Sequence, residues 1–112
     1  MFDLHGALLK KQEHECARLD AFRFRHRART MRLLADWARS RLPAGGGAPD
    51  PGTLAEAVAT TADGALLDDL HRHLEPAGVS RRQLDRRYER ARAEAYQQLV
   101  AEFGDPNPHP LA

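Results

Sequence analysis

Apolar residues recur at helical spacing along the first third of the chain. No proline lies between Leu4 and Leu42, and Gly6 is the only residue in that stretch that strongly weakens a helix. The spacing therefore predicts helix through most of Leu4 to Leu42. Its expected inward stripe is Phe24, Ala28, Met31, Leu34 or Ala35, Ala38 and Leu42, broadened by Leu33 and Trp37, and its opposite side carries Arg25, Arg29, Arg32, Asp36 and Arg39.

The opening segment, residues 1–19, has a weaker pattern. Leu4, Ala7, Leu8 and Lys11 give it a modest amphipathic character, which propensity alone leaves marginal in water. The remaining helices can form a bundle without this segment. A detachable amphipathic helix at a terminus is suited to insertion into a groove on a partner.

A break follows, and two short helices are predicted after it. The prolines and glycines of residues 43–52 cannot continue a helix. Thr53 and Glu56 have the spacing of a capping box, which predicts a short helix that begins at Thr53. Asp63 is expected to cap a second short helix over residues 65–74. The inward positions of the two helices are Leu54, Ala57 and Val58, then Leu66, Leu67, Leu70 and Leu74, and Pro76 and Gly78 end the second.

The last predicted helix has the clearest period in the chain. Ser80 and Gln83 form a second capping-box pair at its start, and Gly104 followed by Pro106 is a stop signal. Its inward positions are Leu84, Tyr88, Ala91, Ala95 and Leu99, with Tyr96, Val100 and Phe103 beside them. The proline-rich tail, residues 105–112, is expected to be disordered.

Length and composition fix the fold class. A chain of 112 residues fits one domain with one modest core. Isoleucine is absent and valine occurs only at three positions, so leucine and alanine must build that core. We therefore predict an all-α fold: a four-helix bundle of two long and two short helices over residues 20–104, preceded by a flexible or helical N-terminal segment.

Charge is unevenly distributed although the net charge is only +1. Residues 1–42 hold ten Lys and Arg against five Asp and Glu, whereas residues 43–112 hold seven against eleven. The two parts should attract each other. This asymmetry serves the packing of a small bundle, or it attracts an acidic partner to the first part, such as nucleic acid or an acidic protein surface.

Cysteine and histidine give no sign of a metal site or a disulfide. The single Cys16 cannot form an intramolecular disulfide, and a partly buried, inert thiol is expected there. His71 and His73 are two residues apart, which on a helix points them to different sides. We expect no metal and no cofactor. The N-terminus lacks the pattern of a signal peptide and no apolar run is long enough to span a bilayer, so a cytoplasmic protein without membrane insertion is expected.

Catalysis has no supporting pattern, and we predict that the protein is not an enzyme. Asp68 and Asp69 diverge as neighbours on a helix, and the glycines at 45–47 lack the lysine and helix of a phosphate loop. Nucleic-acid binding is an alternative, because arginines wind around the first helix from Arg23 to Arg32 and around much of the last helix. Acidic neighbours such as Glu89 can neutralise much of the charge on the last helix. The arginines considered there are Arg81, Arg82, Arg86, Arg87 and Arg90.

Two blocks of sequence resemble the zeta-type inhibitors of bacterial F-type ATP synthases. The first reads R-F-R-x-x-A-R-x-x-R-L-L-x-x-W-A, and comprises Arg23, Phe24, Arg25, Ala28, Arg29, Arg32, Leu33, Leu34, Trp37 and Ala38. The second is Asp69-Leu70, then Ala77-Gly78-Val79-Ser80 and Arg86-Arg87, with a small deletion after Ser80. The resemblance covers most of residues 20–100.

The resemblance implies a four-helix bundle, monomeric when free, whose N-terminal segment enters the catalytic sector of the ATP synthase. There it would lie between the catalytic subunits and the rotor and block ATP hydrolysis, which implies a location peripheral to the inner membrane. The segment departs from the family after Phe2-Asp3, so a helical adaptor that keeps the fold without inhibition is a further alternative. The implied partner-binding residues are Phe2, Asp3, Leu4, Leu8, Leu9, Lys10, Lys11 and Arg18.

Overall fold

Four α-helices and one 3-10 turn make up the fold. The computed structural model describes residues 4–43, 47 and 49–106, with side chains from Cys16 onward. The elements are α1 (Leu4–Arg41), α2 (Pro51–Ala57), α3 (Asp63–Leu74), η1 (Glu75–Ala77) and α4 (Arg81–Phe103), and no strand occurs within those ranges. The predicted all-α bundle of two long and two short helices is therefore confirmed.

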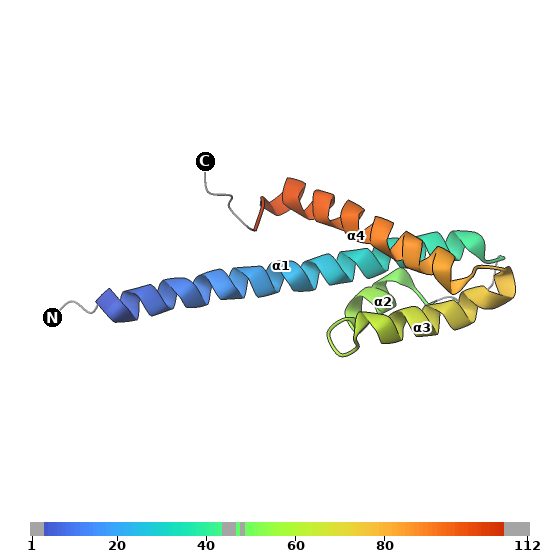
Figure 1. Cartoon of the computed structure of the whole chain (residues 1–112), viewed down its shortest axis with the longest axis horizontal. Helices are drawn as coiled ribbons and strands as arrows, with labels where there is room; N and C mark the ends of the chain where they lie inside the picture. Colours follow the sequence, from blue (N-terminus) through green and yellow to red (C-terminus); the bar gives the residue numbers. More distant parts are fainter. Residues whose placement is uncertain (1–3, 44–46, 48, 107–112) are drawn as a thin grey trace.

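Helix α1 is the scaffold of the molecule. It has 38 residues, about 57 Å at the usual rise per residue, and the longest dimension of the chain is 67 Å. Its C-terminal half contacts α2 and α3 on one side and α4 on the other, while its N-terminal half projects beyond them (Figure 1). The helix runs without interruption across residues 19 and 20, the boundary expected between segment and bundle.

Leucine and alanine form the core, as composition requires. Met31, Leu34, Leu74 and Leu84 are completely buried. Thr30 is the only buried polar residue in the described part, and its hydroxyl donates to the carbonyl of His26 at 2.6 Å. The continuous core cluster consists of Met31, Leu34, Ala35, Ala38, Leu54, Val58, Leu66, Leu67, Leu70, Leu74, Val79, Leu84 and Ala91, with Ala28, Leu33, Trp37, Leu42, Ala57 and Tyr88 packed against it.

One expected core position on α1 is wrong. Phe24 is 46% exposed, whereas Phe22 is buried. The stripe that faces α4 at this level passes through Phe22 and His26, whose rings both meet the ring of Tyr96 edge-on. Phe24 instead lines a surface hollow together with residues of α2 and α4.

The predicted start of α2 is also wrong. The N-cap is Asp50, whose carboxylate accepts from the backbone N–H groups of Gly52 and Thr53, at 3.0 and 3.4 Å. The helix therefore begins at Pro51, which suits a first helical position because its missing N–H would have no partner there. Thr53 lies inside the helix and does not cap it.

Asp63 does not cap α3. The helix begins at Asp63 itself, and its N-cap, Ala62, makes no side-chain cap hydrogen bond. The Asp63 carboxylate contacts Arg27 and Tyr88 instead. At the other end the prediction holds, because η1 terminates at Gly78 in the left-handed conformation, with φ +84°.

Helix α4 follows its prediction closely. Ser80 accepts from the backbone of Gln83, and the Gln83 side chain accepts from the backbone of Ser80, which completes the capping box. Leu84, Ala91, Ala95 and Leu99 are buried, and the helix stops before Gly104. Of the three residues expected beside this stripe, Val100 is half-buried, whereas Tyr96 and Phe103 are exposed, at 37% and 57%.

Cys16 differs from expectation as well. Its thiol is exposed, because α1 projects past the bundle at this level and nothing described packs on it. The predicted disordered tail begins within the described residues at 105–106, and residues 107–112 lie outside them.

Candidate interaction surfaces

The projecting half of α1 carries most of the residues predicted to bind a partner. Leu4, Leu8, Leu9, Lys10 and Lys11 lie on this helix, although their side chains are not among those described, and Phe2 and Asp3 lie outside the described residues. Arg18 is exposed where the projection meets the end of α4. Six of the eight predicted residues therefore share one continuous helix.

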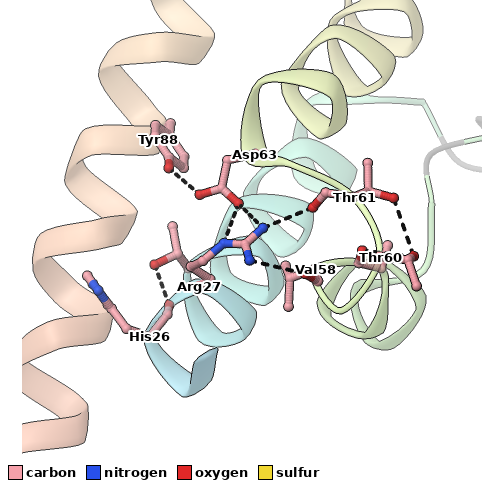
Figure 2. A network of polar contacts seen from close by, with 9 residues as sticks. His26, Arg27, Val58, Thr60, Thr61, Asp63 and Tyr88 are labelled. Atoms are coloured by element: carbon pink, nitrogen blue, oxygen red, sulfur yellow. Dashed lines mark hydrogen bonds and ion pairs between the residues drawn. The ribbon is translucent and has the colours of Figure 1, made fainter. Parts of the chain in front are cut away.

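Behind the projection, Arg27 joins three elements of the bundle (Figure 2). Its Nε donates to Asp63 Oδ1 at 2.9 Å, and its two terminal nitrogens donate to the carbonyls of Val58, at 3.1 Å, and Thr61, at 2.9 Å. These carbonyls belong to the turn that connects α2 to α3. A planar guanidinium suits three such acceptors because its donors diverge in a fixed fork.

Tyr88 extends this network to α4. Its hydroxyl donates to Asp63 Oδ2 at 2.6 Å, so the two oxygens of Asp63 hold α1 and α4 respectively. Burial of the hydroxyl, together with its hydrogen bond to Asp63, raises the pKa of Tyr88 to about 12. The group therefore remains a neutral donor at any physiological pH.

A second ion pair links α1 to the end of α4. Arg29 donates to both carboxylate oxygens of Glu102, at 2.6 and 2.9 Å. This bidentate contact lowers the pKa of Glu102 and raises the pKa of Arg29. The Arg27–Asp63 and Arg29–Glu102 ion pairs both join the basic first part of the chain to the acidic second part, as the charge distribution predicts.

Trp37 is half-buried and lies between two cations. The guanidinium carbons of Arg41 and Arg87 lie 5.6 and 5.7 Å from the centre of its ring. Arg87 belongs to the second block of the resemblance and Trp37 to the first. The structure thus brings the two blocks together by a cation–π contact between α1 and α4.

The remaining residues of the two blocks divide between core and surface. Leu34, Ala38 and Val79 are buried, and Ala28 and Leu33 pack against the core. Gly78 has a structural role at the end of η1. The exposed members with large side chains are Arg23, Phe24, Arg25, Arg32 and Arg86.

Among the exposed members, Phe24, Arg25 and Arg32 line one hollow on the α1–α4 surface. The hollow has a volume of about 280 Å³, and Ala28, Arg29, Ala55, Leu99 and Phe103 complete its lining. A neighbouring hollow of about 400 Å³ lies nearer the projection and shares Arg25 and Phe103 with it. The guanidinium of Arg25 lies over the Phe103 ring, 4.7 Å from its centre.

Nucleic-acid binding gains little from the arginines of α4. Arg81 pairs with Asp85 at 2.9 Å and also with Asp68, and Arg92 pairs with Glu89 at 3.5 Å. These ion pairs reduce the net positive field that a phosphate backbone would meet. Arg82, Arg86 and Arg90 are exposed on the same helix.

Neither a metal-binding cluster nor a membrane-spanning helix occurs among the described residues. No group of three or more His, Cys, Asp and Glu side chains there has a metal-binding arrangement. His73 Nδ1 instead donates to the carbonyl of Asp69 at 2.9 Å. None of the described helices is long and apolar enough to cross a membrane.

The network of Arg27, Asp63 and Tyr88 was not predicted from the sequence. Arg27 lies outside the motif positions, Asp63 was expected to be a cap and Tyr88 a core residue. Arg27 and Tyr88 lie 36 and 25 residues from Asp63 in the sequence, so no local pattern indicates these contacts. The only hint is that two polar residues occupy positions that face the bundle.

Compared with known proteins, the chain matches no family model, no curated protein and no solved structure.

Proposed function

We propose that this protein is an inhibitory or regulatory subunit of an F-type ATP synthase, which blocks ATP hydrolysis by inserting the N-terminal half of α1 into the catalytic sector. The observation that carries the proposal is that α1 continues well beyond the bundle as one uninterrupted helix (Figure 1). The resemblance of Arg23 to Ala38 to the zeta-type inhibitors supplies the identity of the partner.

The mechanism is mechanical and requires no chemistry from the inhibitor. A helix inserted between subunits that must move past one another binds one rotational state better than the others. Binding energy then holds the enzyme in that state, and turnover stops by a shift of population. The bundle acts as the holder that sets the direction of α1, and the protein itself is no enzyme.

Several features of the bundle suit it to this role as a rigid holder. Arg27 and Arg29 clamp α1 to the α2–α3 turn and to α4 through ion pairs. The aromatic contact of Phe22 with Tyr96, with ring centres 5.6 Å apart, lies close to the point where the projection begins. A load on the projecting helix is therefore transmitted to several elements.

The test is an assay of ATP hydrolysis by the catalytic sector of the ATP synthase from the same organism. The full chain should inhibit, and a variant that lacks residues 1–19 should still fold as a bundle by circular dichroism but should not inhibit. Arg90→Ala, a change at an exposed residue of α4, serves as the matched control and should inhibit fully. Inhibition that survives the deletion would rule out the wedge mechanism, and absence of any binding would rule out the function.

A further inference from the structure

The most prominent exposed apolar surface in the described part of the chain lies between α1 and the end of α4. Of the three large hydrophobic side chains that are more than a third exposed in the described part, two, Phe24 at 46% and Phe103 at 57%, line the same hollow there. Both lie in elements that are otherwise firmly packed. Exposed aromatic side chains grouped in a concave site are typical of a protein interaction surface.

These two rings lie outside the hydrophobic core of the bundle. Neither ring belongs to the core cluster, and the floor of the hollow is formed by Ala28 and the buried Leu99. A side chain that entered from outside would contact apolar side chains of both α1 and α4. We call this hollow the α1–α4 groove; Phe24 and Phe103 border it, and Ala28 and Leu99 form its floor.

The charged side chains that line the α1–α4 groove are all basic. Three arginines of α1 (Arg25, Arg29 and Arg32) line it, and its described lining contains no carboxylate. Glu102 already binds Arg29. Arg25 stacks on Phe103, and neither Arg25 nor Arg32 forms an ion pair with a described residue, so both can receive an acidic group of a partner.

We propose that the α1–α4 groove is a docking site for an amphipathic helical segment of a partner protein, whose apolar stripe is bordered by acidic residues on the side that faces α1. Arg25 and Arg32 are seven residues apart, about 10.5 Å along the helix. A partner helix that runs alongside α1 would match them with two carboxylates about two turns apart. The apolar anchor of that helix fills the space over Ala28 and Leu99.

The same observations disfavour nucleic acid as the occupant. Arg29 is already bound by Glu102 of α4, so only Arg25 and Arg32 of the three lining arginines remain to receive an anionic group. Two cations supply few of the phosphate contacts on which nucleic-acid binding depends, whereas an amphipathic helix also gains from the apolar residues that line the groove. The inference does not depend on the proposed function, because it concerns the bundle and leaves the projecting half of α1 unused.

A phage-display experiment tests this inference. Random 16-residue peptides are selected for binding to the intact protein. We expect enriched sequences with apolar residues at helical spacing and with Asp or Glu seven positions apart. A synthetic, fluorescein-labelled peptide of the enriched sequence should bind with an affinity that falls at least about tenfold in Phe24→Ser, the loss typical of a buried aromatic anchor. Arg32→Glu should weaken it similarly, and replacing the peptide's acidic residues by Lys should restore binding to that variant.

Arg90→Ser is the matched control on the far part of α4 and should bind the peptide as the wild type does. Three results would overturn the inference. The first is the absence of any enrichment that depends on Phe24, and the second is the selection of basic or uncharged peptides. The third is occupation of the groove by something else, seen as Phe24-dependent dimerisation in light scattering or as Phe24-dependent binding of a labelled single-stranded oligonucleotide.

Discussion

Arg27 and Asp63 join the longest helix of this protein to the start of α3, across 36 residues of sequence, through an ion pair of 2.9 Å. The pair is partly exposed, with 37% and 22% of the two side chains accessible, and by itself an ion pair of this kind contributes little. Its significance lies in the additional donations from Arg27 to two backbone carbonyls. Through them the same guanidinium also fixes the α2–α3 turn.

Replacement of Arg27 should therefore cost more than the loss of a surface charge. We expect Arg27→Ala to lower the free energy of unfolding by about 2 kcal/mol, since hydrogen bonds that involve charged groups contribute roughly this much. Arg27→Lys should recover only part of the loss, because one ammonium cannot reach all three acceptors in the same geometry. Urea denaturation followed by circular dichroism measures both values.

Arg23→Ala is the matched control for this experiment. Arg23 lies one turn earlier on α1, its side chain is 75% exposed, and its only described ion pair, with Asp20, is 3.9 Å long. Its replacement should change the free energy of unfolding by less than about 0.5 kcal/mol. Equal effects of the two alanine variants would contradict the assigned role of Arg27.

The raised pKa of Tyr88 leads us to expect that the protein loses stability at high pH. Its pKa is about 12 in the folded protein and near 10 in the unfolded chain. Between these values the unfolded chain has released the proton that the native state still holds, so the free energy of unfolding decreases as the pH rises from 10 to 12. Below pH 10 the contribution is fully present, because Tyr88 is protonated in both states.

The titration itself can be observed directly. The chain has two tyrosines, so Tyr96→Phe leaves Tyr88 as the only one. Absorbance of tyrosinate at 295 nm in that variant should rise with a midpoint near pH 12, and addition of Asp63→Asn should shift the midpoint downward, because the carboxylate that accepts from the hydroxyl is removed. A midpoint near 10 in the single-tyrosine variant would show that the hydroxyl is not held as described.

The N-cap of α2 gives a third prediction. Asp50→Ala should lower the free energy of unfolding by about 1 kcal/mol, because two backbone N–H groups lose their acceptor. Thr53→Ala should change it by less than about 0.5 kcal/mol, since Thr53 is exposed within the helix and makes no cap. The sequence pattern at Thr53 and Glu56 predicts the reverse order, so the pair of variants separates the two assignments by urea denaturation.

These examples show which parts of the fold the sequence could predict. Local sequence patterns predicted the structure correctly where only one helix start or one buried face was compatible with them. Ser80 with Gln83 marks the start of α4, and the leucines of α3 all face the core. At α2 two starts compete within three residues. Asp50 prevails because Pro51 is preorganised for a first helical turn.

Other parts depend on how the elements pack side by side, which a local pattern does not contain. Phe24 lies on the apolar stripe by spacing alone, yet it is exposed, whereas Phe22 is buried and packs against Tyr96 of α4. The acceptors of Arg27 are known only after α1, the α2–α3 turn and α4 have been brought together. The charge asymmetry of the chain predicted that such contacts exist, but not which residues make them.

The continuity of α1 leads to a final prediction, which rests on the proposed function. Ala17 is exposed on α1, between the projecting part and the first buried residue, Phe22. Proline at this position removes a backbone hydrogen bond and clashes with the preceding turn, at a cost of about 3 kcal/mol within a helix. Because the projecting part can unfold by itself, Ala17→Pro should leave the urea midpoint of the bundle nearly unchanged. It should nevertheless abolish inhibition of ATP hydrolysis, since the bundle would no longer set the direction of the inserted helix. Ala17→Gln, which changes the same exposed position but keeps the helix, should affect inhibition far less. Full inhibition by Ala17→Pro would mean that the two parts of α1 act without a rigid connection.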